Sequence, residues 1–148
     1  MIFKEIKGDL FLNTHPNDSL AHCISKDLKR SKGIATEFVK LFGRKDNELL
    51  SQNPTIGDIV IIDFIENPTK FIYNLITKEK YFHKPNGYKS ITECLTKMRD
   101  HAIKNNVTNI NMPRIGCGLD KLKWNNVQEI IIDIFSNTNI KITVYYLE

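Results

Sequence analysis

Apolar residues follow two different periods along this chain, and the two periods predict strands in some stretches and helices in others. Residues 19–25 form a short, mostly apolar run, and residues 57–65 and 70–77 are rich in β-branched side chains. Runs of this kind are typical of buried strands. Asn67 and Pro68 lie between the last two runs and predict that these two strands form a hairpin.

Three longer stretches place apolar residues at helical spacing. Residues 33–43 carry apolar side chains three or four positions apart and close on a glycine, which favours a helix C-terminus. Residues 90–106 gather most of their apolar side chains on one face, and residues 125–138 are helical in pattern despite many isoleucines. Further strands are predicted over residues 2–7, 107–112 and 140–147.

The order of these elements predicts the fold class. Strands and helices alternate through the second half of the chain, which indicates an α/β layer structure with helices on both faces of the sheet. The 148 residues contain no repeat, linker or low-complexity segment. We therefore expect a single domain over residues 1–148, large enough for a sizeable core.

Composition and charge narrow the function only slightly. Hydrophobic residues make up 41% of the chain and charged residues 26%, as in an ordinary globular protein. The net charge of +4 is mild, and no arginine cluster or aromatic–basic stripe supports nucleic-acid binding. Nucleic acid is thus a weakly supported partner, although a basic surface also suits any polyanionic ligand.

Cysteine and histidine usage argues against disulfides and metals. Cys23, Cys94 and Cys117 are odd in number and lack paired spacing, so a disulfide framework is not expected. The histidines form no zinc-binding pattern, and we expect no metal and no cofactor. Neither a signal peptide nor a membrane-spanning run is present, which indicates a cytoplasmic, reducing location without membrane contact.

Two glycine-containing turns lead directly into predicted helices. They lie at residues 33–35 and 116–118, beyond the ends of predicted strands, where ligands bind in α/β sheets. Backbone N–H groups at such turns bind anions, and two loops on either side of one ligand would suit a diphosphate. A simple tight turn is an equally good reading of the spacing. The sequence GCGLD lacks the end of a Walker A motif and the last glycine of a dinucleotide fingerprint.

A family resemblance runs over residues 8–147. In the order of the family, the chain contains GDLF, DSLAHCIS, GIATEFVKLFG, LITKEKYFHKP, MPRIGCGLDKLKW and KITVYYL. These stretches resemble the macrodomains of the ADP-ribosyl-glutamate hydrolase class, which are also described as terminal ADP-ribose protein glycohydrolases and O-acetyl-ADP-ribose deacetylases. The resemblance implies ADP-ribose as the ligand. It also implies a macrodomain-like three-layer α/β/α fold with a mixed central sheet.

The resemblance further implies a set of ligand-binding positions. Two of them, Asp9 and Leu10, would face the adenosine end, and Ser25 would lie near the phosphates or the distal ribose. Residues 33–35 and 114–120 would form the two loops beside the phosphates. The complete set is Asp9, Leu10, Ser25, Gly33, Ile34, Ala35, Arg114, Ile115, Gly116, Cys117, Gly118, Leu119 and Leu147.

The catalytic pair that the resemblance implies is Lys84 and Asp120. A neutral lysine amine can attack the anomeric carbon of the distal ribose, or the aldehyde of its open form. Free lysine is almost entirely protonated at neutral pH, so a carboxylate that accepts its proton is needed. On residue type alone, Lys84 could equally be a solvated loop residue and Asp120 a helix N-cap.

The expected function is therefore a hydrolase that removes mono-ADP-ribose from acidic side chains of proteins and deacetylates O-acetyl-ADP-ribose. Two alternatives remain open: a non-catalytic ADP-ribose-binding module, and a hydrolase of ADP-ribosylated nucleic acid. We expect a monomer. The chain departs from the family at Ser31 and Lys32, where the family usually has smaller residues, so this loop is expected to be stiffer or to fit the distal ribose differently. The connector after Lys84 also looks one residue longer than usual.

Overall fold

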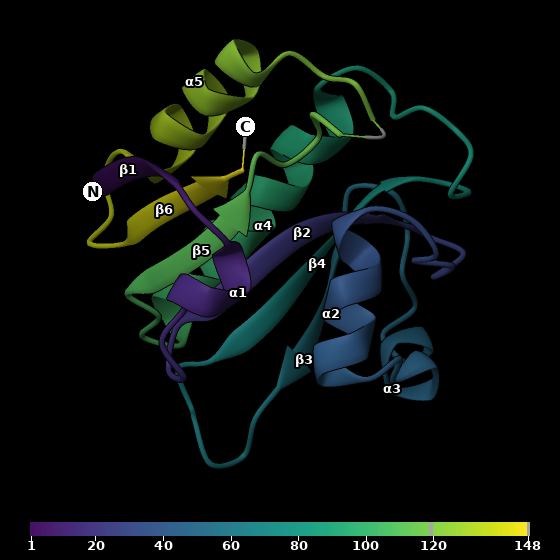
Figure 1. Ribbon diagram of the computed structural model, residues 1–148, viewed down its shortest axis with the longest axis horizontal. Helices are drawn as coiled ribbons and strands as arrows, with labels where there is room; N and C mark the ends of the chain where they lie inside the picture. The colour runs from purple at the N-terminus through teal and green to yellow at the C-terminus, as the bar shows by residue number, and fades with distance from the viewer. Residues whose placement is uncertain (119, 148) are drawn as a thin grey trace.

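The computed structural model describes residues 1–118 and 120–147, and its centre is a six-stranded sheet (Figure 1). The spatial order is β1-β6-β5-β2-β4-β3. All neighbouring strands are parallel except β3 and β4, which form the predicted antiparallel hairpin, so the sheet is mixed as predicted. The strands are β1 (Ile2–Lys7), β2 (Ser19–Ser25), β3 (Ile59–Asp63), β4 (Phe71–Lys78), β5 (Asn109–Pro113) and β6 (Lys141–Tyr146).

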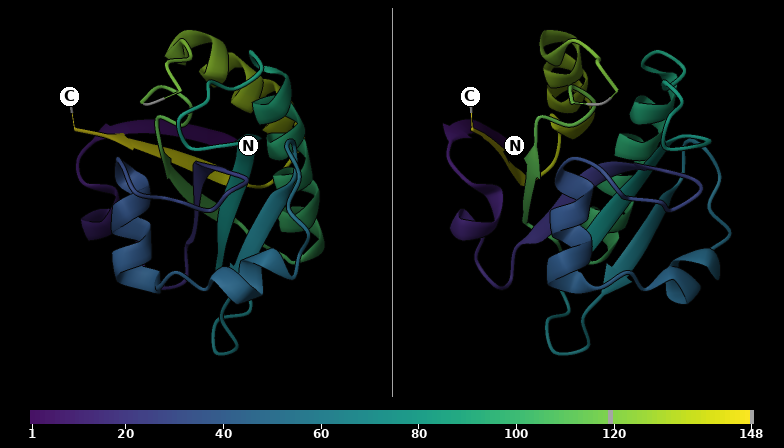
Figure 2. Two further views of the ribbon diagram at one scale, coloured as in Figure 1. Left: turned by 90° about the vertical axis from the view of Figure 1, so that its right-hand side faces the viewer. Right: turned by 45° about the vertical axis from the view of Figure 1, so that its right-hand side comes forward.

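Helices cover both faces of the sheet, which confirms the three-layer prediction. Figure 2 shows the sheet between α1 and α2 on one side and α4 and α5 on the other. Two separate apolar clusters correspond to the two interfaces, one shared by α4 and α5 and the other by the shorter helices. The helices are α1 (Leu10–Asn13), α2 (Ile34–Phe42), α3 (Asp46–Leu50), α4 (Lys89–Lys104) and α5 (Trp124–Phe135).

Strand β4 shows why the sheet is buried on both faces. Every residue of this strand is buried. Successive side chains point to opposite faces of a strand, so Tyr73 and Leu75 join the cluster beneath α4 and α5, whereas Ile72 and Ile76 join the other. A continuous apolar run is the pattern expected for a strand that is covered on both sides.

The main elements match the prediction to within a few residues, and two short helices were not predicted. Helix α1 has four residues and α3 has five, too few for a helical period to show in the sequence. Helix α1 begins after Asp9, whose carboxylate accepts hydrogen bonds from the N–H groups of Phe11 and Leu12 at 2.9 and 3.0 Å. Asp9 is thus an N-cap, a common role for aspartate.

The carboxyl ends of three neighbouring parallel strands meet at one edge of the sheet. Strands β5, β2 and β4 end there at Pro113, Ser25 and Lys78. The pairing of β2 with β4 shifts at this point, because Ile24 pairs with Ile76 whereas the next residue, Ser25, pairs with Lys78. Thr77 is therefore the extra residue of a β-bulge, a feature that redirects side chains and is often found beside active sites.

Candidate active site

A cavity of about 390 Å³ opens at this edge of the sheet. Its position, beyond the carboxyl ends of the parallel strands, is the usual place for a ligand in an α/β fold. Its volume lies within the range of about 300–1,000 Å³ for small-molecule sites. The walls are formed by residues 22–25, 30–35 and 113–116, together with Lys78, Tyr81, Gly118 and Asp120.

The chemically distinctive feature of this cavity is a buried pair formed by Lys78 and Asp120. The Lys78 Nζ lies 2.5 Å from Asp120 Oδ1, and the two side chains are only 8% and 7% exposed. The second carboxylate oxygen, Oδ2, accepts a hydrogen bond from Thr77 Oγ1 at 3.2 Å. Lys78 ends strand β4, whereas Asp120 lies in the loop before α5. The cavity therefore contains an amine and a proton acceptor within direct transfer distance.

Lys84 occupies a different place. It is exposed, and it borders a separate, more open depression together with His83 and Pro85. Lys78 borders both hollows, and of the two lysines it is Lys78 that contacts Asp120. The predicted convergence of Lys84 and Asp120 is thus corrected, because the lysine that meets this carboxylate belongs to the end of strand β4 and not to the connector that follows it.

The remaining predicted ligand-binding residues divide into two groups. Those that line the cavity are Ser25, Gly33, Ile34, Ala35, Arg114, Ile115, Gly116 and Gly118. Four others do not line it: Asp9 caps α1, Leu10 is buried in the core, Cys117 packs against the core, and Leu147 is 67% exposed. Leu119 lies outside the described residues.

Two glycine-containing backbone segments border the cavity. Gly33 precedes α2 with a φ of 64°, and no side chain caps the start of this helix. The first N–H groups of a helix have no partner within the helix and attract anions. On the opposite wall, Gly116 has a φ of 76°, a conformation that favours glycine. Both predicted glycine turns therefore border the same cavity, as a ligand with two phosphates would require.

The nearby thiols and imidazole are poor candidates for nucleophile or base. Burial, reinforced by the charge of Asp120, raises the pKa of Cys23 well above its ordinary value. Burial also raises the pKa of Cys117 to about 11. Burial lowers the pKa of His22 to about 3, and this ring lies against Phe38 with 3.7 Å between centroids. The thiols thus remain protonated and the imidazole neutral, so none of the three supplies a ready nucleophile or base.

Within residues 1–118 and 120–147, no three His, Cys, Asp or Glu side chains are grouped so that they could hold a metal ion. None of the helices in this part of the chain has the length and apolar character needed to cross a membrane.

Fold and cavity together define an α/β domain whose cavity is bordered by two glycine turns and a buried amine–carboxylate pair. The chain belongs to the Macro domain family, which matches residues 21–131. It is 46% identical over 142 residues to the human protein named ADP-ribose glycohydrolase OARD1, covering 96% of this chain and 90% of the relative. It is also 31% identical over 92 residues to Uncharacterized protein 032R of Invertebrate iridescent virus 6, covering 62% of this chain and 87% of that protein.

Solved structures confirm the fold. The macrodomain of Thermus aquaticus DarG superimposes with a TM-score of 0.85 at 21% sequence identity, covering 98% of each chain. Thermosipho africanus DarTG in complex with ADP-ribose gives a TM-score of 0.79 at 16% identity, covering 97% of this chain and 41% of that one. At these identities the likeness concerns the fold alone.

Proposed function

We propose that this protein is an ADP-ribose glycohydrolase in which Lys78 is the nucleophile and Asp120 the acid–base residue. The observation that carries the proposal is the 2.5 Å contact between Lys78 Nζ and Asp120 Oδ1 in a cavity with two glycine turns in its walls. The 46% identity to a protein named ADP-ribose glycohydrolase OARD1 supports it. We further propose that the substrate is mono-ADP-ribose attached to an acidic side chain of a protein.

In the proposed complex, the diphosphate accepts hydrogen bonds from the N–H groups of the two glycine turns, near Gly33 and Gly116. The distal ribose then reaches the end of strand β4. Because the phosphate charge is neutralised by backbone dipoles and helix α2, binding requires no metal ion. The main contribution of the cavity is to hold the anomeric carbon beside the Lys78 amine, which turns a slow encounter into a reaction within one complex.

The first chemical step forms a bond between Lys78 Nζ and the anomeric carbon. Asp120 removes a proton from the ammonium group, and the freed electron pair attacks the carbon. The carbon–oxygen bond to the modified side chain breaks, and its electrons leave with the carboxylate. The bond between the anomeric carbon and the ring oxygen then breaks as a proton passes from the nitrogen to that oxygen, which leaves a protonated imine between Lys78 and the open sugar. Water adds to the imine carbon and loses a proton to the solvent. The carbon–nitrogen bond breaks as the new hydroxyl gives its proton to the nitrogen, ADP-ribose leaves as the aldehyde, and Asp120 returns its proton to the Lys78 amine.

The test is to trap this imine. Addition of cyanoborohydride during turnover should attach ADP-ribose permanently to the protein, and peptide mass spectrometry should place the adduct on Lys78. Lys78→Arg should give no adduct, while Lys84→Arg should give the same yield as the wild-type protein. An adduct that maps to Lys84, or that survives in Lys78→Arg, would falsify this assignment.

The alternatives are distinguished by substrate. A module that only binds ADP-ribose does not need an amine and a carboxylate buried together, so the Lys78–Asp120 pair favours an enzyme. Exposed Lys29, Lys32 and Lys80 near the cavity keep nucleic acid as a second candidate for the modified molecule. Parallel assays with an ADP-ribosylated acidic peptide, ADP-ribosylated DNA and O-acetyl-ADP-ribose should show the fastest release from the peptide.

A further inference from the structure

One wall of the cavity is a loop with a strained backbone conformation. Residues 30–33 of this loop line the cavity. Leu28 and Arg30 have φ values of 57° and 47°, in the left-handed region that side-chain-bearing residues avoid. Each such residue strains the backbone. A loop of this kind keeps its shape only when the surrounding structure holds it there.

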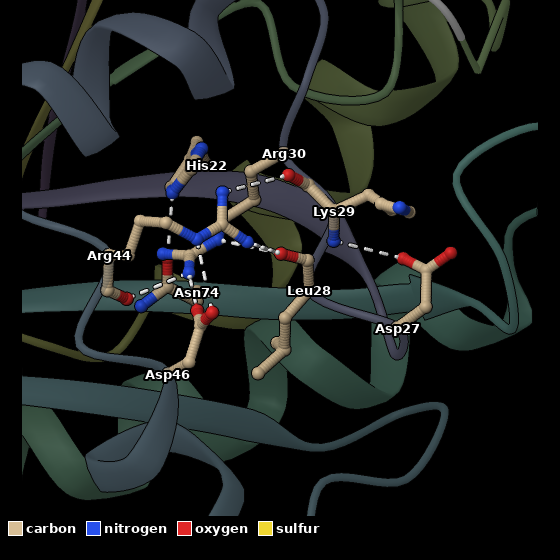
Figure 3. A network of polar contacts seen from close by, with 8 residues as sticks. All are labelled: His22, Asp27, Leu28, Lys29, Arg30, Arg44, Asp46 and Asn74. Carbon is tan, nitrogen blue, oxygen red and sulfur yellow. Dashed lines mark hydrogen bonds and ion pairs between the residues drawn. The ribbon is translucent and has the colours of Figure 1, made fainter.

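Two guanidinium groups hold this loop, that of Arg30 within the cavity wall and that of Arg44 behind it. Arg44 donates hydrogen bonds from Nη2 to the Leu28 carbonyl at 2.8 Å and from Nη1 to the Lys29 carbonyl at 3.3 Å. Arg30 donates from Nη2 to the Arg44 carbonyl at 2.7 Å and from Nε to the Leu28 carbonyl at 3.3 Å. These contacts join the two strained positions to the segment between α2 and α3, as the dashed lines in Figure 3 show.

Asp46 makes this arrangement of two like charges possible. Its Oδ1 lies 2.5 Å from Arg30 Nη2, and its Oδ2 lies 3.0 Å from Arg44 Nε, so one carboxylate binds both cations (Figure 3). The Arg30 side chain is only 2% exposed. Burial of one positive charge beside another is costly unless a carboxylate compensates it. We call Arg30, Arg44 and Asp46 the arginine latch.

A second contact fixes the beginning of the same loop. The Asp27 carboxylate accepts a hydrogen bond from Ser25 Oγ at 2.5 Å and one from the Tyr81 N–H at 3.1 Å. Asp27 therefore ties the loop to the end of β2 and to the connector after Lys78. The arginine latch holds the part of the loop that follows, where the two left-handed residues lie.

We infer that the arginine latch is a positioning device, which holds the 28–33 wall in its ligand-binding shape before the ligand arrives. The inference rests on the proposed function only for the identity of the ligand, ADP-ribose. Neither Arg44 nor Asp46 lines the cavity, so both act through the loop. A wall that is ordered in advance raises affinity because less conformational freedom is lost on binding. Lys78 and Asp120 belong to other segments, so the latch affects binding far more than the chemical step.

The experiment compares Asp46→Asn with the wild-type protein. This change keeps the size of the side chain but removes the charge that holds the two guanidinium groups together. We expect the amides of residues 28–32 to exchange with deuterium at least about tenfold faster. We also expect the dissociation constant for ADP-ribose, measured by calorimetry, to rise about tenfold, with kcat within about twofold of the wild-type value.

Arg44 offers a matched pair of variants. Arg44→Lys keeps the positive charge but cannot reach two carbonyl groups with a planar fork, so it should weaken ADP-ribose binding nearly as much as Arg44→Met. Lys97→Met is the control, because it breaks a similarly exposed ion pair, with Asp58, among residues that do not line the cavity. The control should leave both amide exchange in the loop and ADP-ribose affinity unchanged.

The outcomes separate this inference from the proposed function. Unchanged exchange in residues 28–32 of Asp46→Asn, or faster exchange without loss of affinity, would overturn the positioning role. If Asp46→Asn does not fold, Arg44→Met removes the repulsion between the cations together with the fork and gives the same two readouts. A wild-type protein that does not bind ADP-ribose at all would contradict the proposed function. Amide exchange in residues 28–32 would still show whether the arginine latch orders the loop.

Discussion

Lys78 and Asp120 lie 42 positions apart in the chain, yet their side chains form the most deeply buried ion pair beside the cavity. Lys78 is fixed by strand β4, which is buried along its whole length. Asp120 reaches it from the loop between β5 and α5. The relationship places an amine and its proton acceptor in one site although no local pattern connects them.

The two lysines should differ sharply in turnover. Lys78→Ala should lower kcat at least about 10³-fold, because both the nucleophile and the proton that Asp120 handles are lost. Lys84→Ala should change kcat by less than about twofold, because the exposed Lys84 does not line the cavity. Release of ADP-ribose from a modified acidic peptide measures both. Equal losses in the two variants would contradict the assignment.

The free energy of unfolding should depend strongly on the buried Lys78–Asp120 pair. Lys78→Met leaves the Asp120 carboxylate without its partner and should lower the free energy of unfolding by about 3 kcal/mol, the lower end of the range for broken buried pairs because the cavity admits solvent. The double variant Lys78→Met/Asp120→Leu should recover most of this loss. Urea unfolding of the three proteins measures the effect. Additive losses in the double variant would argue that the two side chains are not coupled.

Alanine substitutions at the two glycines of the second turn should have different effects on stability and on ligand affinity. Gly116→Ala places a side chain at a φ of 76°, with Cβ 2.9 Å from Leu122 Cδ1, and should cost about 1–2 kcal/mol of stability. Gly118→Ala meets nothing within 4 Å, so its stability should change by less than about 0.5 kcal/mol.

Gly118→Ala should nevertheless weaken ADP-ribose binding, because an added methyl group obstructs the close approach of a ligand to the backbone. Thermal unfolding and calorimetric titration of both variants measure the contrast. A Gly118→Ala variant with unchanged affinity would show that the ligand does not approach this residue.

Acid should destabilise the protein through His22. The pKa of His22 is about 3 in the folded protein and near 6.5 when the ring is exposed. Between these two pH values the imidazole is protonated in the unfolded chain but neutral in the folded one. This contribution to stability is complete above about pH 6.5 and is lost as the pH falls toward 3. At about pH 5 the loss is roughly 2 kcal/mol.

His22→Gln should show a correspondingly smaller loss of stability between about pH 7.5 and pH 5 in urea unfolding experiments. The exposed His83 provides the control, because His83→Gln should keep the full wild-type loss. Identical pH dependence in His22→Gln and the wild-type protein would mean that His22 takes up its proton in the folded state.

The architecture could be predicted because it depends on patterns within single segments. Apolar periodicity located α2, α4 and α5, and the β-branched runs located β3 and β4 with the turn between them. Short helices such as α1 were not predicted, because four residues after a capping aspartate are too few to show a helical period of apolar side chains. The two glycine turns were also predicted to lie at one site, and both border the same cavity, since both follow strands that end at the same edge of the sheet.

The lysine that pairs with Asp120 was not predicted, because its position depends on the register between two strands. The predicted strand over residues 70–77 ended at Thr77 and therefore left Lys78 outside it. The bulge at Thr77 pairs Lys78 with Ser25 and continues the strand by one residue. A charged residue that directly follows an apolar run of a central strand was the available signal. Asp46 contacts two arginines, one of them 16 positions away. No pattern in the sequence indicates these contacts.

The attachment of Lys78 to the central strand has a consequence for how selectivity can change. Exposed positions of the two neighbouring loops, such as Lys29, Ser31 and Lys32 on one side and Lys80 and Phe82 on the other, include neither Lys78 nor Asp120. They can be exchanged while strand β4 keeps the amine in place. Libraries restricted to such exposed positions offer a direct route to variants that accept a different modified molecule and retain the same proposed bond-breaking step.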